Sequence, residues 1–216
     1  MKDSDYSYLR EKMVREQLIS RGISDKRVLD AFRNIPREIF VPNSRRPYAY
    51  EDTPVSIGLS QTISQPYIVA LMTELLSIKE NDKVLEVGTG SGYQAAILKY
   101  LGAEVYTVER FSQLAEKAEK SLGILGYKVN IKIGDGSLGW SDYAPYDKII
   151  VTAASFSVPS PLIKQLKVGG LMVLPLGGRW QQELTLIRKR DEDLIEKKPI
   201  CGCIFVPLVG EYGYKE

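Results

Sequence analysis

A short glycine-rich run carries the clearest chemical signal in this sequence. Residues 86–92 read EVGTGSG and lie between a predicted strand and a predicted helix. Glycines let the backbone turn sharply there and approach a ligand closely. In open α/β sheets, ligands bind beyond the carboxyl ends of the strands. The run therefore predicts a site for a nucleotide-like ligand.

Three acidic residues reinforce this prediction, because each follows or ends a predicted strand. They are Glu86, Glu109 and Asp135. Any one of them alone is compatible with a solvated strand end, but three in order favour a ligand set. A carboxylate at Glu109 can accept hydrogen bonds from both hydroxyls of a ribose. A dinucleotide fingerprint would require a third glycine at position 93, where the chain has Tyr93, so an NAD oxidoreductase is not indicated.

Composition excludes several other chemistries. The 216 residues include no histidine, which excludes a Ser–His–Asp triad and most zinc sites. The two cysteines, Cys201 and Cys203, are too few for a disulfide framework and are interpreted as small buried hydrophobic residues. The net charge of +2 does not indicate a nucleic-acid partner. No apolar run approaches the ~18 residues of a membrane span, and residues 1–21 are too charged for a signal peptide. We therefore expect a cytoplasmic protein that contacts no membrane.

The elements that position these residues follow from periodicity. A helix is predicted over residues 5–20, ending at Gly22, and a second from an N-cap at Ser24 to about Asn34. Four prolines then mark an irregular stretch before a helix that starts at Pro66. Strands and helices alternate from there, with strands predicted at 83–87, 104–108, 129–133, 148–152 and 171–174 and helices at 91–101, 111–125 and 159–166.

This alternation predicts βαβ units and a parallel sheet. After Gly178 the pattern changes, and residues 183–188 and 200–206 are predicted as antiparallel strands at the edge, joined by a charged turn at 190–193. The fold class is therefore α/β: a doubly wound, Rossmann-like, mostly parallel sheet with antiparallel C-terminal strands and an N-terminal helical appendage. The order of the last strands does not follow from the pattern.

The spacing G-x-G-x-G, with an acid two residues earlier, resembles the first motif of class I S-adenosylmethionine methyltransferases. Residues 58–66, GLSQTISQP, narrow the resemblance to the protein-L-isoaspartate O-methyltransferase family, in which a Thr-Ile-Ser run precedes a helix that starts with proline. Further stretches are similar in the same order, so that the resemblance covers roughly residues 10–210. They are 36–38 with Phe40, 84–94, 134–136, 149–154 and 205–208.

The resemblance implies a specific reaction. Members transfer a methyl group from S-adenosylmethionine, leaving S-adenosylhomocysteine, to the free α-carboxylate of L-isoaspartyl residues in damaged peptides and proteins. D-aspartyl residues are accepted to a lesser degree, and the methyl ester collapses to a succinimide. Residues 1–60 would then be a helical appendage with a substrate-side loop, and residues 61–216 the domain that binds the cofactor. We expect the two parts to form a single compact unit.

The resemblance also assigns the site residues, with Ser64 as the active-site serine. The implied cofactor contacts are Gln61, Thr62, Ile63, Glu86, Gly88, Thr89, Gly90, Gly92, Glu109, Arg110, Asp135, Gly136 and Thr152. The implied substrate contacts are Thr62, Ile63, Ser64, Tyr67, Val206, Pro207 and Leu208. Many members have histidine where this chain has Tyr67, which leaves the substrate contact there open.

The missing histidine is compatible with this reaction. A carboxylate has a pKa near ~4 and is already ionised at neutral pH, so it needs no general base. Ser64 would donate one hydrogen bond that orients the carboxylate, since nothing in the sequence activates it as a nucleophile. The alternative is that Ser64 caps the helix that starts at Pro66.

Three other functions are alternatives to this one. A nucleic-acid methyltransferase of the base-amine class would carry an Asn/Asp-Pro-Pro-Tyr/Phe loop, but residues 152–155 read TAAS. A small-molecule methyltransferase and a cofactor-binding module without catalysis are the remaining alternatives. The tail at 212–214 could close over the site, contact a second subunit or lie on the surface. Monomer and homo-oligomer both remain open.

Overall fold

The computed structural model describes residues 3–215, of which the N-terminal part is helical. Helix α1 (Asp3–Met13) continues through a π-helical turn, η1 (Val14–Leu18), and a 3-10 turn, η2 (Ile19–Arg21), and ends at Gly22 with φ +94°. The later elements of this part are α2 (Lys26–Asn34), η3 (Arg37–Phe40) and η4 (Asn43–Tyr48).

The predicted cap of the second helix is wrong by one residue. Asp25 is the N-cap, and its carboxylate accepts hydrogen bonds from the backbone N–H groups of Arg27 (2.8 Å) and Val28 (3.3 Å). Ser24 instead donates its backbone N–H to Glu74 over 2.7 Å. Both serine and aspartate are favoured at this position, so the local sequence could not separate them. The Glu74 carboxylate accepts the backbone N–H groups of both Ser24 and Asp25.

A seven-stranded sheet, counted over the described residues, forms the centre of the fold in the order β5-β4-β3-β6-β7-β8-β9. Strands β3 to β7 are parallel, and β8 and β9 are antiparallel to their neighbours, as predicted. The strands are β3 (Lys83–Val87), β4 (Glu104–Glu109), β5 (Asn130–Ile133), β6 (Tyr146–Val151), β7 (Leu166–Gly177), β8 (Gln182–Lys189) and β9 (Ile195–Cys203).

The last strands differ most from the prediction. Strand β7 is longer than residues 171–174, and β9 begins at Ile195 and ends at Cys203 rather than spanning 200–206. The charged residues that open β9 gave no strand signal, but they pair with β8 along its whole length, from Lys189 opposite Ile195 to Gln182 opposite Cys203. The pairing of β8 and β9 in one long hairpin therefore determines where both strands begin and end. It also gives the order of the last strands, which the sequence left open.

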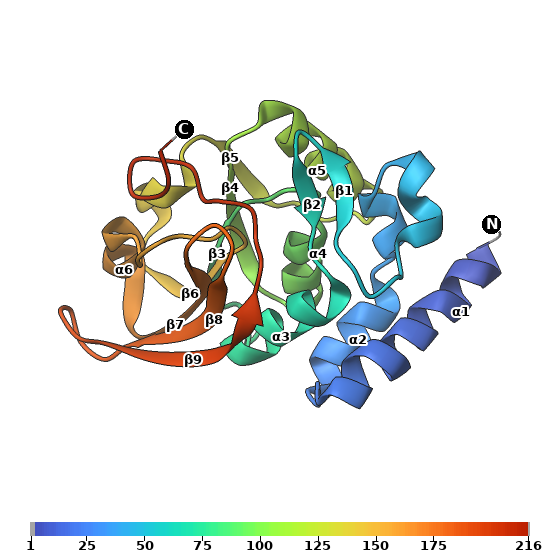
Figure 1. Ribbon diagram of the computed structural model, residues 1–216, viewed down its shortest axis with the longest axis horizontal. Helices are drawn as coiled ribbons and strands as arrows, with labels where there is room; N and C mark the ends of the chain where they lie inside the picture. The colour runs from blue at the N-terminus through green and yellow to red at the C-terminus, as the bar shows by residue number, and fades with distance from the viewer. Residues whose placement is uncertain (1–2, 216) are drawn as a thin grey trace.

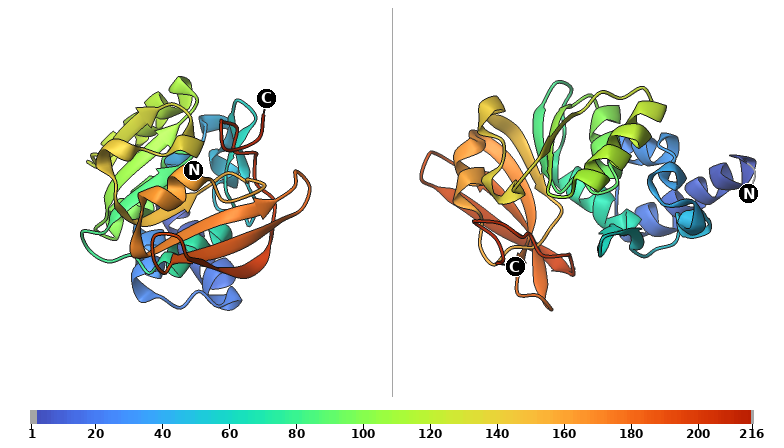
Figure 2. Two further views of the ribbon diagram at one scale, coloured as in Figure 1. Left: turned by 90° about the vertical axis from the view of Figure 1, so that its left-hand side faces the viewer. Right: turned by 90° about the horizontal axis from the view of Figure 1, so that it is seen from above.

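Helices cover both faces of the sheet (Figure 2). Helices α3 (Pro66–Leu76), α4 (Tyr93–Tyr100) and α5 (Ser112–Ile124) share one hydrophobic core with the N-terminal helices. The short helix α6 (Ser160–Gln165) packs in a second core on the other face, near the 3-10 turns η5 (Gly136–Leu138) and η6 (Ser141–Tyr143). The N-terminal helices and the turn that joins β8 to β9 lie at opposite ends of the molecule (Figure 1).

A two-stranded hairpin, which the sequence did not predict, lies between the N-terminal helices and the sheet (Figure 1). It consists of β1 (Val55–Gly58) and β2 (Gln61–Ile63), and its turn residues Leu59 and Ser60 have φ of +52° and +56°. Two positive φ angles suit a tight hairpin, but neither residue type signals such a turn. The hairpin carries the Thr-Ile-Ser run to the edge of the site.

Within residues 3–215, no helix combines the length and the apolar character that crossing a membrane requires.

Candidate active site

The glycine-rich run forms the tight turn that the sequence predicts. Gly88, Gly90 and Gly92 have φ of +93°, +54° and +88°, and α4 begins directly after Gly92. The Thr152 hydroxyl, at the end of β6, donates to the carbonyls of Val87 (3.0 Å) and Gly88 (2.7 Å). A side chain at Gly88 would collide with that hydroxyl. The end of the neighbouring strand therefore fixes the turn.

A pocket lies over this turn, beyond the carboxyl ends of β3, β4 and β6. Most of the proposed cofactor residues line it: Gln61, Thr62, Ile63, Glu86, Gly88, Thr89, Gly90, Glu109, Arg110, Gly136 and Thr152. The proposed substrate residues Ser64, Val206, Pro207 and Leu208 line it as well. Gly92 and Asp135 do not form part of its lining.

Glu86 is the most unusual charge in this pocket. Its side chain is fully buried, and neither carboxylate oxygen has a hydrogen-bond partner among the described residues. Burial raises the pKa of Glu86 from 4.5 to about 8, the Thr107 hydroxyl opposes this rise, and the nearby Glu109 carboxylate adds a smaller rise. A positively charged ligand group beside Glu86 would offset this unfavourable burial.

Glu109, at the end of β4, is held in place differently. One carboxylate oxygen accepts the backbone N–H of Gly90 (2.8 Å), and the other accepts that of Phe111 (3.0 Å). A carboxylate has about four acceptor positions, so two remain for a ligand. The bond to Gly90 ties this acid to the glycine turn, which fixes the direction in which its remaining lone pairs point.

Asp135 is engaged away from the pocket. Its Oδ1 accepts from the backbone and the hydroxyl of Ser137, and its Oδ2 accepts the backbone N–H of Glu211 over 2.7 Å. Its neighbour Gly136 lines the pocket instead. The C-terminal tail is therefore part of the site's framework, and Tyr214 is buried, with its hydroxyl on the Gly177 carbonyl (2.8 Å).

A second pocket, with a cavity volume of about 290 Å³, adjoins the first. It lies between the start of α3 and the end of β9, and Tyr67 lines it. Four residues belong to the linings of both pockets: Thr62, Ser64, Thr152 and Val206. The two pockets therefore meet at the predicted active-site serine.

The Ser64 hydroxyl makes no hydrogen bond within the described part of the chain, and it does not cap α3. The N-cap position is Gln65, without a capping side-chain bond, and Pro66 is the first residue of the helix. The alternative prediction, that Ser64 caps this helix, is therefore wrong. Its hydroxyl remains available to a ligand at the junction of the pockets.

Arg37 holds the backbone of Ser64. Its fully buried guanidinium donates to the carbonyls of Ala49 (2.7 Å) and Ser64 (2.7 Å) and lies 4.9 Å from the centroid of the Tyr93 ring. Burial lowers the pKa of Arg37 to about 10. A buried cation bound to two carbonyls fixes the segment before α3, which links the N-terminal part of the chain to the site.

The sequence did not identify several residues of the site. Arg21, Cys201 and Cys203 line the second pocket, although the two cysteines were expected to be buried. Arg37 lay in a stretch that matched the family, but nothing in that stretch indicated its contact with Ser64. Alternation in β9 puts both cysteines on one face, which was a usable signal, whereas Arg21 gave none.

Known proteins resemble this chain over nearly its whole length. The family model described as protein-L-isoaspartate(D-aspartate) O-methyltransferase matches residues 9–213. A protein-L-isoaspartate O-methyltransferase of Dictyoglomus turgidum is 53% identical over 212 residues, covering 98% of this chain and 96% of its own. A protein-L-isoaspartate O-methyltransferase of Geobacter metallireducens is 51% identical over 211 residues, covering 97% of this chain and 98% of its own.

Solved structures show the same fold. A protein-L-isoaspartate O-methyltransferase superposes with a TM-score of 0.84 at 32% identity, covering 94% of this chain and 67% of its own. A Plasmodium falciparum protein crystallised with S-adenosyl-L-homocysteine superposes with a TM-score of 0.77 at 24% identity, covering 94% of this chain and 98% of its own. Because the family model and these relatives match nearly the whole chain, it belongs to the protein-L-isoaspartate(D-aspartate) O-methyltransferase family.

Proposed function

We propose that the two adjoining pockets divide the methyl transfer of this family, the first holding S-adenosylmethionine and the second the damaged peptide. As a member of the family, the chain methylates the free α-carboxylate of L-isoaspartyl residues and, to a lesser degree, D-aspartyl residues. The ester then collapses to a succinimide. The observation that carries the division is the meeting of the pockets at Thr62, Ser64, Thr152 and Val206.

The first pocket fits the cofactor because its acids are suited to it. When bound, S-adenosylmethionine supplies an activated methyl group on a positively charged sulfur. Glu86 offers an unpartnered buried carboxylate to the positively charged methionine portion. Glu109 has spare acceptor positions for ribose hydroxyls, and Gly88 and Gly90 let the backbone approach closely. Asp135 contributes indirectly, because its carboxylate accepts backbone N–H groups from Ser137 and from Glu211 in the C-terminal tail and so holds the segment next to the pocket in place.

The substrate needs orientation more than activation. An isoaspartyl carboxylate is ionised at neutral pH, so no proton has to be removed by a base. Ser64 donates one hydrogen bond that turns an oxygen of this carboxylate toward the first pocket. Correct alignment of reacting groups can supply ~7–11 kcal/mol of a barrier. Arg37 contributes indirectly by fixing the Ser64 backbone.

The peptide backbone would pair with the segment after β9. Ala154 bonds the Val206 carbonyl (2.8 Å) and the Leu208 N–H (2.7 Å). This leaves the Val206 N–H and the Pro207 carbonyl without partners among the described residues. Backbone pairing with an extended peptide tolerates many sequences, which suits an enzyme whose substrate arises wherever damage occurs.

We also propose a cytoplasmic site of action and no nucleic-acid partner. Both cysteines are free thiols, which suits a reducing compartment. The near-balanced charge of +2 provides no excess of basic residues for a polyanion.

Two synthetic peptides test the function. They are identical except that one carries an isoaspartyl linkage in place of aspartyl, and both are incubated with methyl-labelled S-adenosylmethionine. Base-labile label on the isoaspartyl peptide alone is the expected result. Equal labelling of both peptides, or label on neither while calorimetry detects cofactor binding, would contradict the proposed substrate.

A further inference from the structure

Arg21 brings a positive charge to the second pocket from the far end of the N-terminal helical segment. It closes η2, 43 residues before Ser64 by their numbers, and it belongs to the lining of the second pocket but not to that of the first. Among the described residues that line the second pocket, it is the one charged side chain. A positive charge in the lining of a peptide site is a candidate for recognising a charged group on the substrate.

The guanidinium of Arg21 is held in a defined position. Its central carbon lies 3.6 Å from the centroid of the Tyr67 ring, which is a close cation–π contact. One nitrogen contacts Asp52 over 3.2 Å, and this ion pair is exposed, with 41% and 43% of the two side chains accessible. Arginine has five N–H donors in a fixed fork. The single contact with Asp52 therefore leaves donors for a ligand.

The charge of Arg21 also acts across the pocket. Burial raises the pKa of the Cys201 thiol in β9, the positive charge of Arg21 opposes this rise, and Glu183 adds a smaller rise. The guanidinium therefore lies close enough to influence both walls, α3 through Tyr67 and β9 through Cys201. A peptide side chain between these walls would experience the same positive charge.

The reacting carboxylate is not the best partner for this charge. Methyl transfer occurs where the two pockets meet, at Ser64, whereas Arg21 does not reach the first pocket. A strong ion pair would also lower the nucleophilicity of the reacting oxygen. A carboxylate on a neighbouring residue of the peptide can instead bind Arg21 while the isoaspartyl group stays at Ser64.

We infer that Arg21, stacked on Tyr67, forms a subsite that favours isoaspartyl peptides with an acidic side chain next to the damaged residue. This inference rests on the proposed assignment of the second pocket to the peptide. The ion pair with Asp52 would exchange for one with the substrate. Because such pairs are partly exposed, the preference is moderate and falls as salt rises.

The test compares three isoaspartyl peptides with blocked ends that carry Glu, Gln or Lys beside the damaged residue. Binding is measured by calorimetry with S-adenosylhomocysteine present, and turnover is measured separately with S-adenosylmethionine. The wild type should bind the Glu peptide roughly three- to tenfold more tightly than the Lys peptide at low salt, as expected for a partly exposed pair. Arg21→Gln should remove this ratio, and Arg21→Glu should invert it.

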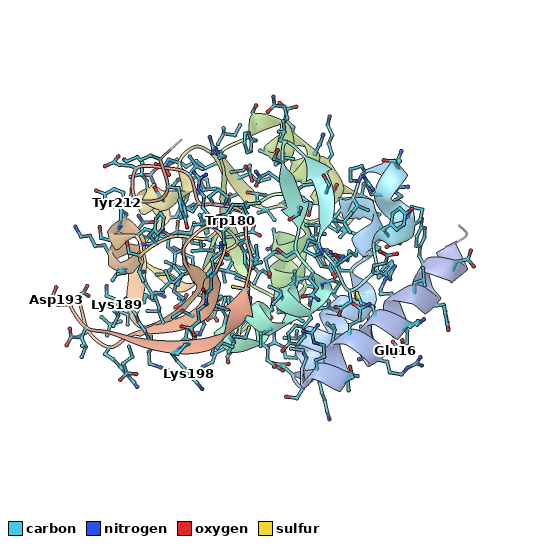
Figure 3. All side chains as sticks on the ribbon, in the orientation of Figure 1. Glu16, Trp180, Lys189, Asp193, Lys198 and Tyr212 are labelled. Carbon is cyan, nitrogen blue, oxygen red and sulfur yellow. The ribbon has the colours of Figure 1, made fainter. Side chains whose placement is uncertain are left out.

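Arg15 provides the matched control. It lies in the same helical segment, pairs with Glu16 over 2.8 Å on an exposed face and does not line the second pocket. Figure 3 labels Glu16 on this segment, at the end of the molecule away from the β8–β9 hairpin. Arg15→Gln and Arg15→Glu should keep the wild-type ratio.

The binding ratio tests Arg21 even where turnover fails, because it is measured without methyl transfer. Equal binding of the three peptides to the wild type, no binding of any of them, or an unchanged ratio in both Arg21 variants would overturn the inference. Failure of the proposed function shows differently, as the absence of methyl transfer to a peptide that binds.

Discussion

At the scale of residues, two buried charges determine how the site is organised. Glu86 is an acid without a partner, and Arg37 is a base bound to two carbonyls. The first is unfavourable in the free protein and would be relieved by a cationic ligand, while the second stabilises the fold around Ser64. The sequence motif identified Glu86, since it sits beside the glycine run. It could not identify the contact of Arg37 with Ser64, because the two are 27 positions apart and no local pattern records that distance.

The raised pKa of Glu86 predicts a pH effect on stability. Between its ordinary value of 4.5 and its folded value of about 8, the folded state holds a proton that the unfolded state has released. The contribution of Glu86 to stability therefore falls as pH rises through this window. The gain in unfolding free energy of the Glu86→Gln variant over the wild type should therefore be larger at pH 8 than at pH 5. The difference should exceed about 1.4 kcal/mol, the equivalent of one pKa unit.

Urea unfolding of wild type and variant at both pH values measures this difference, and calorimetry should show weaker binding of S-adenosylmethionine by the variant. Parallel pH profiles for the two proteins would contradict a strongly raised pKa.

Arg37→Met tests the proposed support of Ser64. The variant loses hydrogen bonds to the Ala49 and Ser64 carbonyls, each of which is worth ~1.5–3 kcal/mol when the donor is charged. We expect a large loss of stability and, at a temperature where the variant is folded, a lower kcat. Arg27→Met is the control, because Arg27 likewise bridges two carbonyls, of Ile78 (2.8 Å) and Leu101 (2.6 Å), outside both pockets. A similar fall in kcat for both variants would argue against a specific effect at Ser64.

At the scale of elements, local signals placed most helices and the parallel strands, because their apolar periodicity is strong. They failed for the β1–β2 hairpin, whose strands are short and whose turn residues are Leu59 and Ser60. They also failed for the start of β9, where pairing with β8 overrides a charged sequence. In both places the structure is set by contacts between segments rather than by the residues themselves.

The corrected helix cap gives a direct prediction at this scale. Asp25→Ala should destabilise the protein by about 1 kcal/mol, since it removes the acceptor for two backbone N–H groups of α2. Ser24→Ala should cost less, because the main contact of Ser24 with Glu74 is made by its backbone N–H. Urea denaturation compares the two, and a larger loss for Ser24→Ala would restore Ser24 as the cap.

At the scale of the whole molecule, the N-terminal helices share a core with α3 and α4. Phe32 is fully buried and packs edge-on against Tyr93, with ring centroids 5.9 Å apart. We propose that the division at residue 60 separates roles rather than folding units: the N-terminal part supplies Arg21 and Arg37 to the site, and the rest supplies the cofactor pocket. The sequence predicted this division within a single compact unit, but it could not show which residues pack the two parts together.

A core substitution tests this view. Phe32→Ala should destabilise the protein by about 3–5 kcal/mol, and the loss should be visible in the fluorescence of Trp140, which packs in the other core. A Trp140 transition that is unchanged while helical circular dichroism falls at lower denaturant would mean that the N-terminal part unfolds on its own.

The most direct test of the account is the kinetics of Ser64→Ala on an isoaspartyl peptide. Because the Ser64 hydroxyl bonds nothing else in residues 3–215 and α3 is not capped by it, the melting temperature and S-adenosylhomocysteine binding should remain unchanged. Loss of one hydrogen bond to a carboxylate, worth ~1.5–3 kcal/mol, should lower kcat/KM by roughly 10- to 150-fold. Wild-type turnover in the folded variant would contradict the claim that the two pockets deliver cofactor and substrate to each other at Ser64.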